Sequence, residues 1–139
     1  MNSIITLDTR GRLVIPNEFR ERLNLKEGDE VLISLDQATD TLTISPIYGK
    51  RINLVKIELE FGDTPGCLAK IANKIAEMKI DLIMTESKSS QRGKQARWDI
   101  IADISNCSYS INEIKQILLQ SGFVESASVS KITRDRLHS

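Results

Sequence analysis

The sequence predicts an α+β fold made of two unlike halves. Three observations support this. A segment with proline, glycine and two basic residues, PIYGKR at 46–51, separates two differently patterned stretches. The stretch after it combines alternating apolar runs with two helical repeats, and the stretch before it places one short helix among short strands. We therefore expect domains at 1–46 and 53–132, joined by a linker at 47–52 and followed by a flexible tail at 133–139.

The first half begins with two short strands around a tight turn. The strand at 6–8 leads into Thr9-Arg10-Gly11, where Gly11 can take the positive φ that a turn needs, and the β-prone residues 13–15 follow. Pro16 suits the first position of a helix because its missing N–H costs nothing there. Phe19 and Leu23 lie four residues apart and share the helix face that we expect to be buried.

A β-hairpin completes this half, with alternating runs at 31–35 and 42–44 around a loop at 36–40. About 45 residues is close to the length of roughly 40 at which a lone chain usually needs a metal, a disulfide or a partner. Cys67 and Cys107 are far apart and outside any C-x-x-C pattern, so we expect free thiols. A homodimer that completes a shared β core is therefore the physical expectation.

The second half shows the order βαββαβ, the ferredoxin-like arrangement with two helices on one face of an antiparallel sheet. Strands are expected at 55–61, 80–85, 96–104 and 123–132. The first helix has Thr64 as its N-cap and Pro65 at its first position. The second helix begins with a capping box of Ser110 and Glu113 and ends at Gly122. Trp98 belongs to the expected core.

Composition excludes several classes of function. The chain has 19 basic and 19 acidic residues, so any DNA contact must be focused on a local patch. No apolar run suits a signal peptide or a membrane span, which predicts a cytoplasmic protein without a membrane partner. His138 is the single histidine, and no grouping of Ser, Cys or His surrounds it. We expect neither catalysis nor a metal site nor a cofactor.

The stretch TRGRLVIPNEFRERLNLKEGDEV resembles the AbrB/SpoVT family of swapped-hairpin DNA-binding domains, whose pattern is roughly G-x-[VI]-x-[IL]-P-x-x-[IL]-R-x-x-L-x-[IL]-x-x-G-D. The resemblance covers residues 4–45 and implies an intertwined dimeric β-barrel whose first loop and short helix face double-stranded DNA. Carried over by position, it marks Arg12 and Arg20, with Arg10 in the same loop. Glu21 stands where some members have a second helix arginine, and Arg22 follows it.

The arginines also have a simpler reading as solvated surface charge. The i, i+2 spacing of Arg10 and Arg12 places both side chains on one face of an extended chain, and a dimer doubles them. Guanidinium groups can hold phosphates or a guanine edge, which favours DNA. Arg22 is the weaker candidate because Glu18, four residues earlier, can pair with it.

The stretch FGDTPGCLAKIANKIAEMKIDL resembles the ACT domain, a small-molecule regulatory module, over residues 53–132. ACT domains commonly pair side by side and bind an amino acid at the interface. The contact positions fall on Asp63 and Asp81. The rest of the expected ligand site is the strand-to-helix loop, namely Thr64, Pro65, Gly66, Cys67 and Leu68. The simpler reading is a helix start with Cys67 as a small buried filler.

Together the two resemblances imply a DNA-binding transcriptional regulator of prokaryotic type, at least dimeric, whose second half senses an amino acid or related metabolite. One alternative is the antitoxin of a toxin–antitoxin pair, since the swapped-hairpin fold also occurs there. Another is a regulatory subunit that controls a biosynthetic enzyme through the ACT half.

Overall fold

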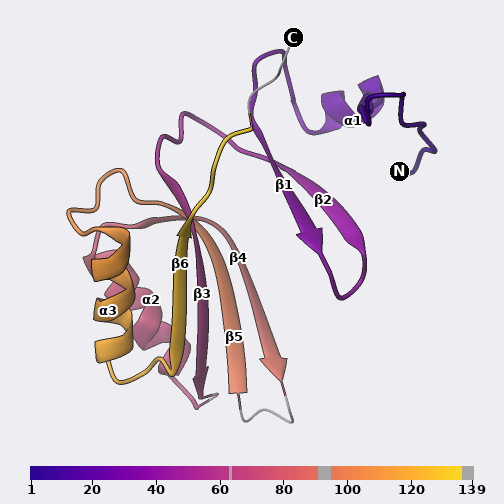
Figure 1. Ribbon diagram of the computed structural model, residues 1–139. Helices are drawn as coiled ribbons and strands as arrows, with labels where there is room; N and C mark the ends of the chain where they lie inside the picture. The colour runs from indigo at the N-terminus through magenta and orange to yellow at the C-terminus, as the bar shows by residue number, and fades with distance from the viewer. Residues whose placement is uncertain (63, 91–94, 136–139) are drawn as a thin grey trace. The chain divides into compact units, whose positions relative to one another are not determined.

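The computed structural model describes residues 1–62, 64–90 and 95–135. The chain divides into two compact units, residues 1–49 and residues 50–139 (Figure 1). Both contain antiparallel β-structure together with helix, so the fold is of the mixed α+β class. The helices in the described part of the chain are all too short or too polar to cross a bilayer.

The N-terminal unit holds helix α1 (Asn17–Arg22) and a hairpin of β1 (Val31–Asp36) and β2 (Thr41–Pro46). The predicted hairpin is confirmed. The helix begins one residue later than expected, so Pro16 is its N-cap residue. Phe19 and Leu23 on the expected face are only half-buried, because nothing else in this small unit covers them fully.

The strands expected at 6–8 and 13–15 are not formed, and this part of the prediction is wrong for the single chain. The turn between them is present, with Gly11 at φ 74° and its N–H donating to the carbonyl of Asp8 at 3.1 Å. One further backbone bond, from Asp8 N–H to the Arg12 carbonyl, follows at 2.9 Å. A strand needs a neighbouring backbone along its length, and the two-stranded sheet of this unit contains only β1 and β2.

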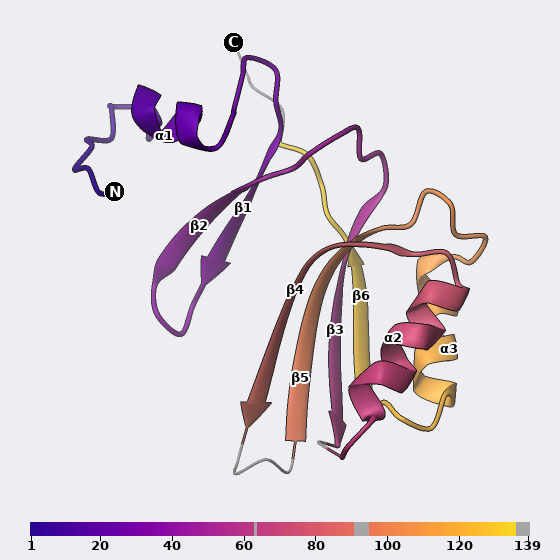
Figure 2. The same ribbon diagram turned by 180° about the vertical axis from the view of Figure 1, so that it is seen from behind.

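The C-terminal unit is a four-stranded antiparallel sheet with two helices on one face (Figure 2). Its elements are β3 (Leu54–Gly62), α2 (Cys67–Glu77), β4 (Asp81–Ser90), β5 (Gln95–Asp103), α3 (Ile111–Gln120) and β6 (Ser126–Lys131). The strands lie in the order β4-β5-β3-β6, and every neighbouring pair is antiparallel. This order of helices and strands is the one that the sequence pattern predicts.

The core lies between the sheet and the two helices. Its largest fully buried side chains are Ile57, Leu59, Ile71, Ile75, Ile100, Ile114, Leu118 and Val55. Trp98 is buried among them as expected, and both cysteines are free thiols. The capping box of α3 is confirmed: the Glu113 N–H donates to Ser110 Oγ at 3.2 Å, and the Ser110 N–H donates to Glu113 Oε1 at 3.1 Å.

The start of α2 differs from the prediction. The N-cap is Gly66 rather than Thr64, and the helix begins at Cys67. The Cys67 N–H donates to the Thr64 carbonyl at 3.1 Å, and Gly66 has φ 83° and ψ −8°. Proline followed by a left-handed glycine under such a bond is a type II turn. The Pro-Gly pair therefore makes a turn that aims the chain into the helix, instead of forming the first helical turn itself.

We predict that Gly66→Ala lowers the free energy of unfolding by about 1 kcal/mol, because an L-residue is strained at this positive φ although an added Cβ meets no atom. Gly62→Ala is the matched control, since its Cβ would only touch the Glu125 carboxylate at 3.9 Å and its φ is not positive. Urea unfolding of both variants measures the difference. Equal stabilities would contradict the turn assignment.

Candidate nucleic-acid interface

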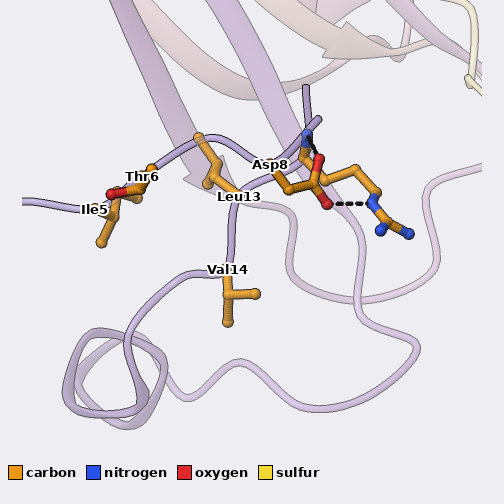
Figure 3. A pocket seen from close by; sticks show the side chains of 6 residues that line it. Ile5, Thr6, Asp8, Leu13 and Val14 are labelled. Carbon is orange, nitrogen blue, oxygen red and sulfur yellow. Dashed lines mark hydrogen bonds and ion pairs between the residues drawn. The ribbon is translucent and has the colours of Figure 1, made fainter. Parts of the chain in front are cut away.

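The arginine-containing turn of the N-terminal unit is organised by the carboxylate of Asp8. Asp8 Oδ1 accepts the backbone N–H of Arg10 at 2.8 Å and that of Arg12 at 2.9 Å. Asp8 Oδ2 accepts from Arg12 Nε at 2.7 Å, so the two side chains point toward each other (Figure 3). One carboxylate thus fixes the backbone of the turn and the direction of an arginine side chain.

The Arg12 side chain stays accessible despite this ion pair, with 68% of its surface exposed against 40% for Asp8. The pair uses Nε, and the planar guanidinium has two further nitrogens that can act as donors. The hydrogen bonds from the backbone and side chain of Arg12 hold the pKa of Asp8 below its ordinary value. Arg10 is tied to Asp8 through its backbone only. The turn therefore presents two arginines on a fixed backbone.

The two helix arginines are placed less firmly. Arg20 Nη2 donates to Asn17 Oδ1 at 3.4 Å, a long hydrogen bond on the exposed surface of α1. Among the described residues, Arg22 forms no ion pair with Glu18, so the expected pairing is wrong. An exposed i, i+4 pair is worth only a few tenths of a kcal/mol, too little to hold two long side chains. Arg22 is thus as available for DNA as Arg20.

A shallow pocket of about 510 Å³ opens beside the turn (Figure 3). Its lining residues are Ile5, Thr6, Asp8, Arg12, Leu13 and Val14. Neighbouring apolar side chains are strongly exposed, with Ile4 at 100% and Val14 at 76%. Charged and apolar groups side by side suit a surface that receives both a polyanion and another protein chain.

The sequence analysis missed Asp8, although a signal was present. Asp at the first position of a turn that ends in Gly, as in Asp8-Thr9-Arg10-Gly11, often accepts backbone N–H groups two residues on. The sequence thus predicts both the turn and the residue that accepts its backbone N–H groups. The residue that positions these cations is the acidic one before them.

The lowered pKa of Asp8 leads to a pH prediction. The hydrogen bonds to its carboxylate are complete above the ordinary pKa of 3.8 and are lost as the pH falls through the lowered value of the folded state. In an NMR titration, the amide shifts of Arg10 and Arg12 should move together with a midpoint below 3.8. In Asp8→Asn these shifts should not titrate in that range. A midpoint at or above the ordinary value would contradict the observed bonding.

Among the described residues predicted to bind an amino acid, Asp81 lies apart from residues 64–68 within one chain. Asp63 lies outside the described residues. Thr64, Pro65 and Gly66 form the exposed turn, and Leu68 is 41% exposed. Cys67 is buried and its Sγ donates to the Phe123 carbonyl at 3.6 Å, as a core filler would.

Asp81 lies at the opposite end of the sheet from this loop. It is the register partner of Asp103, which in turn pairs with Leu54 at the start of β3, whereas the loop follows Gly62 at the end of β3. The nine residues of β3 span eight rises of about 3.3 Å, which separates the two ends by roughly 26 Å. The Asp81 carboxylate is also engaged by Arg51. A joint site would therefore require the loop of one chain and Asp81 of another.

The sheet face that the helices leave uncovered carries a charge network that the sequence analysis did not identify. Arg97 bonds Glu58 at 2.5 Å and Asp99 at 2.9 Å, and the hydrogen bond to Asp99 raises the pKa of Arg97. Glu58, Asp99 and Glu86 are register neighbours and form a row of carboxylates across three strands. Lys56 pairs with Glu58 at 3.7 Å and Lys88 pairs with Glu86 at 3.5 Å, so charges of both signs alternate on this face and it is not a basic patch for a polyanion. Within the described residues, no group of three or more His, Cys, Asp or Glu is placed to hold a metal ion.

Comparison with known proteins finds a family match that lies almost entirely within the first unit. Residues 4–51 match the family described as "Antidote-toxin recognition MazE, bacterial antitoxin". Over 62 residues the chain is 37% identical to "Transcriptional regulator MraZ" of Shewanella baltica strain OS195 and 36% identical to the protein of that name from Shewanella oneidensis. Each match covers 45% of this chain and 40% of the relative, so the chain spans less than half the length of these relatives. Residues 4–51 are thus similar to antitoxin-type domains, and a stretch of 62 residues of the chain is similar to transcriptional regulators.

A solved structure resembles the fold of the chain at low sequence identity. The formyltetrahydrofolate deformylase of Pseudomonas syringae pv. tomato superposes with a TM-score of 0.52 at 10% identity, over 60% of this chain and 29% of the deformylase chain. That share of the chain exceeds what residues 1–49 contain, so the likeness includes the C-terminal unit. The likeness concerns the fold alone.

Proposed function

We propose that this protein is a transcriptional regulator that binds double-stranded DNA through its N-terminal unit. The observation that carries the proposal is the Arg10 and Arg12 turn held by Asp8, inside a segment similar to antitoxin-type domains. The chain is also similar to MraZ transcriptional regulators over 62 residues. A fixed turn with exposed guanidinium groups has a geometry that phosphates and guanine edges require. Arg20 and Arg22, both exposed on α1, would add further cations to this interface.

A homodimer is the form in which this unit would bind. The cross-strand pairs Ile33–Ile44 and Leu35–Leu42 lie on one face of the hairpin, and Ile33 and Leu35 are 61% and 64% exposed. Exposed apolar side chains such as these stabilise a protein only when another surface, here that of a second chain, covers them. A two-fold dimer of the swapped-hairpin type would bury this face and place two basic turns on one surface.

The C-terminal unit would act as an ACT-type sensor of an amino acid or a related metabolite. Its βαββαβ order and sheet support this, while the separation of Asp81 from the 64–68 loop means that the ligand would bind between two chains. The ligand could alter DNA binding only by the difference between its affinities for two arrangements of the protein. The proposal gives the chain no catalytic role.

The match to an antitoxin family favours a second candidate, an antitoxin that neutralises a toxin and also binds DNA. The appended segment here is a folded unit with its own core, whereas an antitoxin that wraps its toxin would use a chain that folds on binding. Co-purification of a small protein encoded beside this gene would favour the antitoxin. A regulator should purify alone.

Genome-wide DNA pull-down with the purified chain, with and without an extract of small metabolites, tests the proposal. We expect enrichment of one or a few promoter fragments, with an affinity that falls steeply with salt because three arginines per chain in a dimer would release about six counterions. A metabolite-dependent change in enrichment supports the sensor role. Recovery of random fragments only would rule out the regulator.

A further inference from the structure

The segment that leads from one unit to the other is fastened to the end of the C-terminal sheet by Arg51. We call residues 47–53 the connector. Arg51 Nη1 pairs with Asp81 Oδ2 at the start of β4 and lies 4.0 Å from Asp103 Oδ2 at the end of β5. The side chains of Arg51 and Asp103 are 31% and 9% exposed, so the second contact is shielded from solvent far better than a surface ion pair.

The two carboxylates, Asp81 and Asp103, would repel each other without the Arg51 cation. Asp81 and Asp103 are direct register partners on neighbouring strands, and like charges placed opposite each other repel. Asp103 is also the one buried charged residue in the described part of the chain. Burial raises the pKa of Asp103, but hydrogen bonds from Ser105 and the Asn53 N–H and the charge of Arg51 outweigh it, so the pKa is lowered and the carboxylate is ionised. A buried carboxylate of this kind is stable only with its partners in place.

Further bonds fasten the same few residues. Arg134, just after β6, donates from Nη1 to the Ile52 carbonyl at 3.2 Å and from Nη2 to the Arg51 carbonyl. The Ile104 N–H donates to the Asn53 carbonyl at 3.0 Å. Residues from β4, β5 and the chain after β6 thus converge on three consecutive connector residues. So many bonds to a chain segment outside any helix or strand indicate that its path is fixed.

We propose that Arg51 is a clamp that holds the connector on the C-terminal unit, and that opening this clamp is the step by which that unit changes the DNA affinity of the N-terminal unit. The proposed effect of the clamp on DNA affinity rests on the proposed regulatory function. A ligand or a partner chain that engages Asp81 would compete with Arg51 for the same carboxylate. The clamp would then release the connector without any change in the core.

Hydrogen exchange on the full chain tests the clamp without DNA or ligand. Arg51→Met removes the cation and keeps the apolar stem, and we expect exchange at the Asn53 and Ile104 amides to become about tenfold faster, as the loss of a charged hydrogen-bond partner implies. Asp81→Asn should produce a smaller increase, because Arg51 keeps Asp103. Lys50→Met is the matched control, an exposed cation beside the clamp, and should leave these amides unchanged. Exchange in Arg51→Met equal to that in the control would overturn the clamp.

DNA affinity of the same variants tests the regulatory part. With a promoter fragment recovered by the wild type, Arg51→Met should shift the Kd by about fivefold or more in either direction, and Lys50→Met should not. Faster exchange with an unchanged Kd would overturn the regulatory step while the clamp stands. If the wild-type chain binds no DNA, the regulator proposal fails, and the proposed effect of the clamp on DNA affinity fails with it. The exchange result still tests whether Arg51 holds the connector.

Discussion

Arg12→Ala is expected to abolish specific DNA binding while the dimer persists. A bidentate arginine contact to a base edge is worth about 1–3 kcal/mol, and a dimer loses two of them, so the affinity should fall by about thirtyfold or more. The turn itself should survive, because Asp8 Oδ1 still accepts the backbone N–H groups of residues 10 and 12. Fluorescence anisotropy with an operator fragment at fixed salt measures the affinity, and analytical ultracentrifugation measures the dimer.

Lys26→Ala is the matched control for the loss of one positive charge. Lys26 is exposed after α1. Its backbone N–H donates to Asp29 Oδ2 at 2.8 Å and its carbonyl accepts the Asp29 N–H at 3.0 Å. This variant should lose little affinity. Arg12→Lys should bind with intermediate strength, because it keeps the charge but not the planar fork. An Arg12→Ala protein with wild-type affinity would refute the assignment of the basic turn to DNA.

Leu35→Lys is expected to split the dimer and, through it, to abolish DNA binding. Leu35 faces Leu42 across the hairpin, and its side chain is 64% exposed in the single chain, so the substitution buries no charge within one chain. In a dimer that covers this face, a buried ammonium costs about 3 kcal/mol or more, which weakens association at least about a hundredfold. Analytical ultracentrifugation should show a single chain at concentrations where the wild type is dimeric.

Ser34→Lys provides the control on the other face of the same strand. Ser34 is the neighbour of Leu35 and pairs with Thr43, both on the exposed face that carries no apolar pair. This variant should remain dimeric with unchanged circular dichroism. If Leu35→Lys stays dimeric, the exposed hairpin face is not the dimer contact and the swapped-hairpin proposal is wrong.

Local patterns predicted the elements of this protein well. Alternation of apolar and polar residues located β1, β2, β3 and β5, and the Ser110 and Glu113 capping box located the start of α3. These features depend on a few adjacent residues, so they can be read without knowledge of the rest of the chain. The same reasoning failed at Thr64 and Pro65, because a helix N-cap and a type II turn use the same residues. Gly66, whose positive φ selects the turn, decided between them.

Contacts between distant residues could not be predicted in this way. The amino-acid site was predicted from sequence position alone, and the register of β4 and β3 puts Asp81 and residues 64–68 at opposite ends of the sheet. The expected strands at 6–8 and 13–15 likewise depend on a neighbouring backbone that one chain does not supply. The Glu18–Arg22 pair had the correct spacing, but spacing does not overcome side-chain entropy on an exposed helix.

The sequence by itself determined the order of helices and strands, the Gly11 turn and the arginines beside it, because turn chemistry and hydrophobic periodicity act over a few residues. Only the tertiary structure decided which charges meet. It placed the Asp8 carboxylate under the arginine turn and brought Arg51 to Asp81 and Asp103, residues 30 and 52 positions away along the chain. The pairing of such charges follows from strand register and chain path, which the whole core sets and no short stretch of sequence encodes.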